Sequence, residues 1–363
     1  MSVFGKYIQV SLFGASHEEY IGITIHNYPS GIMLNEDKIS KKLALRRGLN
    51  YLTSKRFEKD EFKIISGIYN KHTTGAPITI LVKNTDVLSS EYEKQRGLAR
   101  PSHADYTYHL KYRGFNDYRG GGTASGRLTV ALIVLGAFCE EILNTKNIII
   151  ASRMKQIKHL IDKDVEISLD LLKKLKEEEF PVFDKTIKNE MLELISKTKE
   201  EDDSLGGIIQ TYIDNLPIGL GEPFWDSFES IISHLIFSIP GVKGIEFGSG
   251  FDFVHLYGSE ANDGLELINN KVNYLSNHNG GINGGITNGN LVVFNTVFKP
   301  TSSIGKPQKT IDFLKNENKI IEISGRHDAI IAIKGLHVIN ALSAYAVLEL
   351  LLGTNLWNDI EKK

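Results

Sequence analysis

The stretch SGRLTVALIVLGAFCEEILN, residues 125–144, gives the strongest indication of the fold in this 363-residue chain. Apolar residues occupy nearly every side of a helix drawn through it, which is typical of a helix buried among other elements. A second long apolar segment, GLHVINALSAYAVLELLLG at residues 335–353, closes the fold near the end of the chain. The sequence therefore predicts helices in the interior of the protein.

Predicted strands lie on both sides of this buried helix along the chain. They are rich in β-branched and aromatic residues. Further helices are predicted at residues 34–48, with Asn35 as the N-cap, within residues 168–199 as solvated peripheral helices, and at residues 223–239. Because strands and helices are mixed without a regular βαβ pattern, the sequence predicts an α+β fold with antiparallel sheets. The strand segments are KYIQVSL (6–12), FKIISGIY (62–69), PITILV (77–82), GGIIQTYI (206–213), GIEFG (244–248) and NLVVFNTVF (290–298).

The composition is that of a globular protein, with 41% hydrophobic and 24% charged residues. A net charge of −2 gives no electrostatic footprint for nucleic acid. No linker-like stretch divides the chain, which favours one domain over residues 1–363. The start, MSVFGKYIQVSLFG, lacks the apolar run of a secretory signal and nothing predicts a membrane segment, so we expect a cytoplasmic protein. Cys139 is the only cysteine, which excludes disulfides and thiolate metal sites.

The segment RPSHADYTYH, residues 100–109, raises the question of a metal site. His103, Asp105 and His109 share one face only if the segment is a strand, which its tyrosines favour. Two imidazoles and one carboxylate would suit a metal, but no HExxH motif and no second cluster accompany them. A metal-dependent hydrolase that uses these three residues is therefore the weaker hypothesis, and we predict no metal.

Two other segments suit an anionic ligand. RGGGTASGR, residues 119–127, resembles a nucleotide-phosphate loop but has Arg127 and Leu128 where lysine and a hydroxyl residue belong. Its glycine-rich backbone before a helix start predicts an anion cradle, and a plain glycine turn capped by Ser125 is the alternative. KPTSSIGKP, residues 299–307, offers a lysine and three hydroxyls, which suit a phosphate or a flavin edge as well as a solvated loop.

From residue 13 to residue 328, the order of such segments resembles the chorismate synthase family. The resemblance implies a single-domain β-α-β sandwich that assembles as a homotetramer. It also implies an anti-1,4-elimination of phosphate from 5-enolpyruvylshikimate 3-phosphate, which gives chorismate with reduced FMN and no net redox change. The matching segments are FGASHEEYIGITI (13–25), YPSGI (28–32), TTGAPITI (73–80), RPSHADYTYHLKY (100–112), DYRGGG (117–122), LPIGLGEP (216–223), VKGIEFGSGF (242–251), NHNGGINGGITNG (277–289), FKPTSSI (298–304) and GRHD (325–328).

The resemblance also implies roles for individual residues. His17 would protonate the departing phosphate, and Ser16 would form a proton relay with Ser125. His103 would donate a proton to the reduced flavin, and Asp328 would act as the base through the flavin. Asp105 is then expected to orient its neighbourhood and His109 to be structural. Arg46, Arg100, Arg127 and Arg326 would grip the substrate or cofactor, and FMN would contact Thr123, Ala124, Ser125, Gly241, Gly284, Lys299, Pro300, Thr301, Ser302, Ser303 and Arg326.

The chain departs from the family pattern in several places. GASHE replaces GESHG, and we expect Glu18 to turn away from the site. TASGRL replaces RSSARE, and Ala329 replaces a proline after GRHD. These changes favour, as an alternative, a non-catalytic relative that binds flavin or another anion. The source of reduced flavin stays open between a nicotinamide such as NADPH and an external flavin reductase. No GxGxxG follows a strand, and Leu49, Asn50 and Tyr51 stand where the family has a further arginine, which weakens a nicotinamide site.

Overall fold

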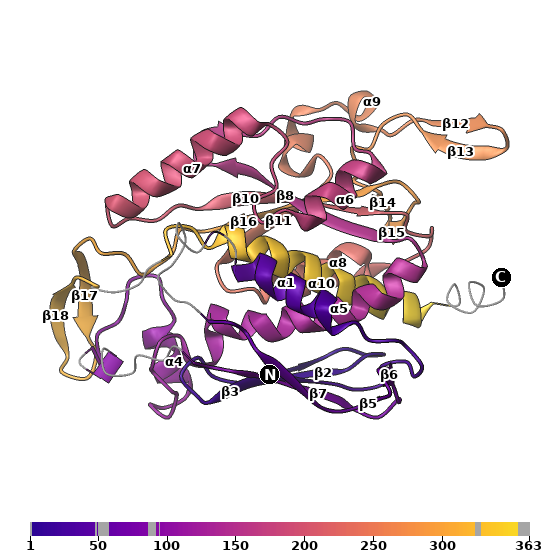
Figure 1. Cartoon of the computed structure of the whole chain (residues 1–363). Coiled ribbons are helices and arrows are strands. Elements are labelled where there is room, and N and C mark those ends of the chain that lie inside the picture. The colour runs from indigo at the N-terminus through magenta and orange to yellow at the C-terminus, as the bar shows by residue number, and fades with distance from the viewer. Residues whose placement is uncertain are drawn as a thin grey trace.

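The computed structural model describes residues 2–47, 49, 58–85, 92–93, 95–323 and 328–354. Two five-stranded sheets enclose a layer of helices, and Figure 1 shows this layer between the sheet near the N-terminus and the later sheet. The predicted α+β fold with a β-α-β sandwich is thus confirmed.

The first sheet has the strand order β1-β2-β3-β7-β4 and is antiparallel throughout. Its central pair sets apolar residues opposite one another, with Ile21 facing Val82 and Ile23 facing Ile80, all of them buried. This alternation is that of a sheet with one face on the core. The strands are β1 Val3–Phe4, β2 Val10–Gly14, β3 Tyr20–Ile25, β7 Ile78–Lys83 and β4 Phe62–Ser66.

The second sheet has the order β11-β16-β10-β8-β9 and is also antiparallel. Its middle strands pair over their whole length, from Gly207 opposite Phe298 to Ile213 opposite Val292. The strands are β11 Val242–Phe247, β16 Val292–Phe298, β10 Gly207–Asp214, β8 Ile149–Ile157 and β9 Leu160–Ile161.

The helical layer contains the two predicted apolar segments. Helix α5 (Thr129–Thr145) packs on the first sheet and α10 (Ala332–Gly353) on the second. They approach so closely that a Cβ added at Gly136 would collide with Ala341. The helices Gly126–Thr145 and Ala332–Gly353 are long and apolar enough to cross a membrane, but 78% and 89% of their apolar windows are buried inside the protein. This burial is that of core helices.

Two further helices complete this layer, and others lie outside it. In α1 (Glu36–Arg47), the Asn35 Oδ1 accepts a hydrogen bond of 3.2 Å from the Lys38 amide, as predicted for an N-cap. Helix α8 (Phe228–Phe237) packs against α10 and β11. The other elements are β5 Ile68–Tyr69, β6 His72–Thr73, α4 Asp105–Lys111, the 3-10 turns η1 Gly122–Ala124, η2 Gly126–Leu128, η3 Phe224–Asp226 and η4 Gly250–His255, α6 Leu169–Glu177, α7 Lys185–Glu200, α9 Gly258–Ala261, β12 Leu265–Ile268, β13 Lys271–Tyr274, β14 Ile282–Asn283, β15 Ile286–Thr287, β17 Gln308–Asp312 and β18 Glu317–Ile321.

The first predicted strand, residues 6–12, begins only at Val10. The amides of Lys6, Tyr7 and Ile8 instead donate hydrogen bonds to the buried carboxylate of Glu349 on α10, at 2.7 Å from the latter two residues. Backbone amides that donate hydrogen bonds to a carboxylate cannot also donate to a neighbouring strand. The prediction failed here because the partner lies more than 300 residues away in the chain.

Candidate active site

A cavity of about 850 Å³ is lined by most of the predicted site residues. This volume lies in the range of small-molecule and cofactor sites. Its walls come from segments distant in sequence, and they meet where the helical layer borders both sheets. Those segments are the β2–β3 turn with Ser16 and His17, the end of α1, residues 120–129, the α8–β11 connection from Phe237 to Lys243, the loop after β16 with Lys299, and the start of α10.

His17 stands at one wall of the cavity, in the turn between β2 and β3. Its Nδ1 lies 3.1 Å from the Oγ of buried Ser16, which donates to the carbonyl of Arg119 at 3.3 Å. Because the hydroxyl proton goes to that carbonyl, His17 Nδ1–H donates to the hydroxyl oxygen. The ring of Tyr92 stands edge-on to His17, with 4.9 Å between the ring centroids. His17 is therefore held from two sides.

Ser125 lines the same cavity as Ser16. Its Oγ accepts a hydrogen bond of 3.2 Å from the amide of Arg127, so it caps the short turn η2. Within the described part of the chain, no hydrogen bond joins the two serines, and their proton relay stays a prediction.

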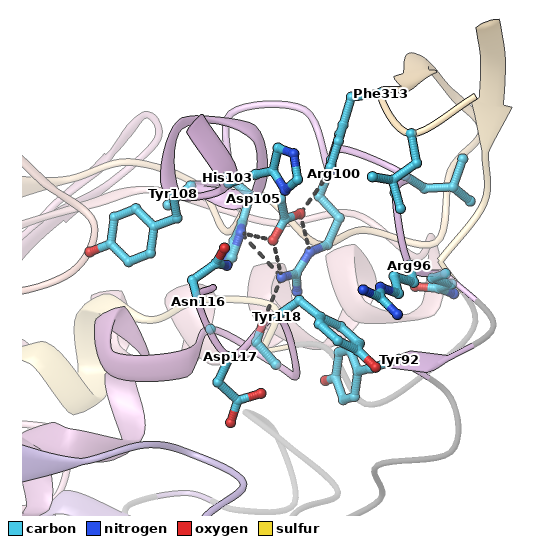
Figure 2. Close-up of a pocket in the computed structure, with 18 of the residues that line it drawn as sticks. Tyr92, Arg96, Arg100, His103, Asp105, Tyr108, Asn116, Asp117, Tyr118 and Phe313 are labelled. Carbon is cyan, nitrogen blue, oxygen red and sulfur yellow. Dashed lines mark hydrogen bonds and ion pairs between the residues drawn. The ribbon is translucent and has the colours of Figure 1, made fainter. Parts of the chain in front are cut away.

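The segment RPSHADYTYH is helical from Asp105 onward, so the predicted strand is wrong. The Asp105 carboxylate accepts hydrogen bonds from Arg100 Nε and Nη2 at 2.8 and 2.6 Å (Figure 2). His103 Nδ1 lies 2.7 Å from Oδ1 of the same carboxylate. Burial raises the pKa of Asp105, but the hydrogen bonds and charges of Arg100 and His103 outweigh it and hold this pKa well below its ordinary value. Asp105 is thus an ionised acceptor.

The helix separates His109 from the other two residues of the proposed metal set. Its ring packs on Phe313 with 4.6 Å between centroids, and it lines a neighbouring cavity of about 70 Å³ that Asp105 also borders. Among the described residues, no group of three His, Cys, Asp or Glu side chains could hold a metal ion. The interpretation of these three residues as metal ligands is therefore wrong, because it depended on a strand.

Besides Arg100, two more of the predicted arginines are committed to protein groups. Arg46 donates from Nε and Nη2 to Thr129 Oγ1 at 3.1 and 2.9 Å. Arg127 is buried and forms ion pairs with Glu58 and Asp60, which are buried as well. Both guanidinium groups line the cavity, but the charge of Arg127 is offset by two carboxylates. Arg326 lies outside the described residues.

Among the predicted cofactor residues that the structure describes, all but two line the cavity. Thr123, Ala124, Ser125, Gly241, Lys299 and residues 301–303 are part of its wall, whereas Pro300 is not. Gly284 lies in the β14–β15 turn and does not line the cavity either. The Thr301 hydroxyl oxygen is buried and has no hydrogen-bond partner among the described residues. An unsatisfied buried hydroxyl in a cavity wall is suited to a polar ligand.

Several cavity residues carried no motif signal in the sequence. Lys334 donates to both carboxylate oxygens of Asp328 at 2.8 and 3.1 Å, in the first turn of α10. Lys243 lies near Lys299, and burial together with the charge of Lys243 lowers the pKa of Lys299. Lys299 Nζ donates to the Ser102 carbonyl at 2.7 Å. Of Lys334 and Lys243, only Lys334 could have been found, from its spacing to the predicted Asp328 across the helix start.

The departures from the family pattern near His17 leave the cavity wall intact. Glu18 is exposed and does not line the cavity, as we expected. Its backbone carbonyl accepts a hydrogen bond of 2.7 Å from Asn84, which also donates to the carbonyl of buried Ala15 at 3.1 Å. Asn84 in turn accepts from Arg127 at 2.8 Å, so this turn is fixed through backbone groups.

Comparison with known proteins gives one consistent result. The family model described as chorismate synthase matches residues 8–352. The chorismate synthase of Korarchaeum cryptofilum is 39% identical over 349 residues, covering 95% of this chain and 96% of its own. That of Thermococcus kodakarensis is 38% identical over 356 residues, covering 98% and 99%.

A solved structure titled "Crystal Structure of Chorismate Synthase" superposes with a TM-score of 0.76 at 24% identity, covering 99% of this chain and 96% of that one. This likeness shows a shared fold. The family match and the nearly full-length identities show more: the chain belongs to the chorismate synthase family and is a chorismate-forming lyase of the shikimate pathway.

Proposed function

We propose that the large cavity holds 5-enolpyruvylshikimate 3-phosphate and reduced FMN together during the elimination of phosphate. One observation carries this proposal: His17, His103 and Asp328 line the same cavity as the loop from Thr301 to Ser303. The volume of about 850 Å³ suits two small ligands side by side.

The residues present fit an anionic flavin. The unsatisfied hydroxyl of Thr301 and the ammonium groups of Lys299 and Lys243 supply a donor and positive charge on one wall. Thr123 and Ala124, in the short turn before Ser125, bring backbone to the cavity as well. When bound, the reduced flavin supplies electron density that helps phosphate to leave and recovers it as hydrogen is lost, so no net redox change results.

The chain's own groups then bind, orient and exchange protons. His17, fixed by Ser16 and Tyr92, presents its ring to the departing phosphate as a general acid. Arg46 adds positive charge from the end of α1. Lys334 fixes both oxygens of Asp328, which orients that carboxylate at the cavity wall as the base. His103 supplies a proton on the flavin side.

The chain is also proposed to form a homotetramer from copies of one domain that covers residues 1–363. The hairpin of β12 and β13 supports self-association because it extends away from the body of the molecule (Figure 1). It carries apolar side chains that are exposed in a single chain. An external flavin reductase is the proposed source of reduced FMN, and a cytoplasmic location and an NADPH site stay predictions.

Equilibrium binding tests the shared cavity. FMN absorbance should shift on addition of the protein, and 5-enolpyruvylshikimate 3-phosphate should tighten this binding because the two ligands would lie side by side and contact each other in one cavity. Thr301→Val should weaken FMN binding by about ten- to a hundredfold, since one hydrogen bond to a charged group is worth about 1.5–3 kcal/mol. Thr310→Val, at a half-buried strand position outside the large cavity whose hydroxyl donates to the Ala99 carbonyl, is the control. Binding that Thr301→Val leaves unchanged would contradict this placement of FMN.

A further inference from the structure

The Asp105 carboxylate is the centre of a small network that no motif assigns to the reaction. It accepts hydrogen bonds from the Arg100 amide at 3.0 Å, from Arg100 Nε at 2.8 Å and from Arg100 Nη2 at 2.6 Å. His103 Nδ1 lies 2.7 Å from the same Oδ1 that Nη2 contacts. Both side chains are largely buried, with 16% of Asp105 and 11% of Arg100 exposed. A buried carboxylate that accepts this many hydrogen bonds is held in one orientation.

The network fixes which ring nitrogen of His103 carries a proton. Nδ1 has two neighbours, Asp105 Oδ1 at 2.7 Å and Arg100 Nη2 at 3.1 Å. Nη2 is a donor only, and it already serves Asp105 and the carbonyl of Gly120. The ionised carboxylate is an acceptor only, so the shorter contact requires a proton on Nδ1. His103 therefore donates from Nδ1 to Asp105.

This leaves the other nitrogen of the ring for the cavity. Within the described part of the chain, His103 Nε2 has no hydrogen-bond partner, and a quarter of the side chain is exposed. A proton that leaves the imidazolium must then leave from Nε2: that N–H bond breaks, its electron pair stays on nitrogen, and the proton bonds to the acceptor in the cavity. The neutral ring keeps its Nδ1 proton and is protonated again at Nε2 by water.

We propose that Asp105 is a positioning residue that holds His103 in its Nδ1-protonated form, and that Arg100 clamps Asp105 instead of gripping a ligand. This inference rests on the proposed function, in which His103 is the proton donor. Figure 2 shows the interactions that join Arg100, Asp105 and His103 beside the smaller cavity.

Arg100 also contacts the backbone beside the second histidine, His17. The Gly120 carbonyl accepts from Arg100 Nη2, and the other side of Gly120 faces His17. A Cβ added at Gly120 would lie 2.6 Å from His17 Cε1, and its φ of +64° already disfavours a side chain. Arg100 thus contacts His103 directly and lies next to His17 only through Gly120, and its guanidinium is directed at protein groups.

The test compares Asp105→Asn with the wild-type full-length chain, labelled with ¹⁵N at histidine and measured with and without FMN. An asparagine amide can donate to Nδ1, which favours the neutral form with its proton on Nε2. We expect the wild-type His103 ring to show a protonated Nδ1 and the variant to lose this signature. The kcat should fall by about a hundredfold while KM for the substrate changes little. Asp105→Glu, which keeps an acceptor, should restore the Nδ1 proton and part of the rate.

Asp117→Asn is the matched control, because Asp117 pairs with Arg119 at 2.8 Å beside the same smaller cavity and does not touch His103. It should leave the ¹⁵N signals of His103 unchanged. A wild-type ring protonated only on Nε2 would overturn the proposal even if Asp105→Asn does not fold. So would an Asp105→Asn protein with an unchanged kcat. Because the ring signals are read without turnover, an inactive wild-type chain would contradict the proposed function and leave the tautomer result intact.

Discussion

At the scale of single residues, His17 and His103 line the cavity and are the two proton donors that we propose for the reaction. If each acts as a general acid, His17→Ala and His103→Ala should each slow turnover by about a hundredfold or more. The rate is measured under anaerobic conditions with reduced FMN supplied. His109→Ala is the control: its ring packs on Phe313 outside the large cavity, so it should lower thermal stability and change the rate little. A full rate in either of the first two variants would refute the role given to that histidine.

His337, buried in α10, provides a test in the pH dependence of stability. Burial lowers its pKa from the ordinary 6.5 to about 4, although its Nε2 donates to the Glu179 carbonyl at 3.4 Å. The unfolded chain therefore takes up a proton near pH 6.5 that the folded chain takes up only near pH 4. Stability contributed by this group is lost as pH falls through that interval, with a slope of up to about 1.4 kcal/mol per pH unit.

His337→Gln should remove that part of the slope, as measured by urea unfolding at several pH values between 7 and about 4. His159→Gln, at an exposed turn, is the control and should leave the slope unchanged. Equal slopes for the wild type and His337→Gln would contradict neutral burial of His337.

Cavity residues that lie within a motif can be predicted from the sequence. Cavity residues that are isolated in the sequence cannot. Ser16, His17 and His103 were identified through the resemblance to the family, which contiguous segments such as FGASHEEYIGITI and RPSHADYTYHLKY carry. Glu58 and Asp60 were not found, since a carboxylate that pairs with an arginine almost seventy residues later leaves no local pattern. The same holds for Tyr92, which contacts His17 across the same kind of separation.

At the scale of elements, Arg153 on β8 joins two strands to the connection that follows β9. It is fully buried, donates to Gln210 on β10 at 2.7 Å, and forms ion pairs with Asp162 and Asp164. Arg153→Met should lower the free energy of unfolding by about 3–5 kcal/mol, because Asp162 would remain buried without its cation. Denaturant unfolding measures this loss.

Lys306→Met is the control for that measurement, since its pair with Asp203 is exposed and should contribute at most about 1 kcal/mol. A similar, small loss in both variants would show that Arg153 is not the link between these elements.

The elements also show why local patterns predict some strands and not others. β7, β10 and β16 were predicted because runs of β-branched residues mark strands with a buried face. β3 and β8 were missed, although each is paired on both sides: Gly22 interrupts the first, and polar side chains such as Arg153 interrupt the second. Residues 105–111 form a helix despite their tyrosines, because tertiary context outweighs β-propensity in short segments.

At the scale of the whole molecule, the β12–β13 hairpin is one apolar feature that a single chain leaves exposed. Leu267 and Val272 pair across its two strands and are 76% and 60% exposed. A two-stranded hairpin has little stability of its own, so a second copy of the chain is expected to cover it. The double variant Leu267→Asp/Val272→Asp should therefore shift the sedimentation coefficient from that of a tetramer to that of a smaller species.

Asn273→Asp adds a charge at a polar position of the same hairpin and is the control. If the double variant sediments like the wild type, the hairpin is not part of the subunit contact.

Turnover in the absence of oxygen tests the central claim, that this one cavity brings substrate and reduced FMN together. Purified protein is mixed with photoreduced FMN and 5-enolpyruvylshikimate 3-phosphate, without a reductase, and chorismate, phosphate and flavin absorbance are followed together. If substrate and reduced FMN meet in this cavity, we expect one chorismate and one phosphate for each substrate consumed, with the flavin still reduced at the end. A folded protein that binds FMN and yields no chorismate would contradict it, and would select the non-catalytic flavin-binding relative instead.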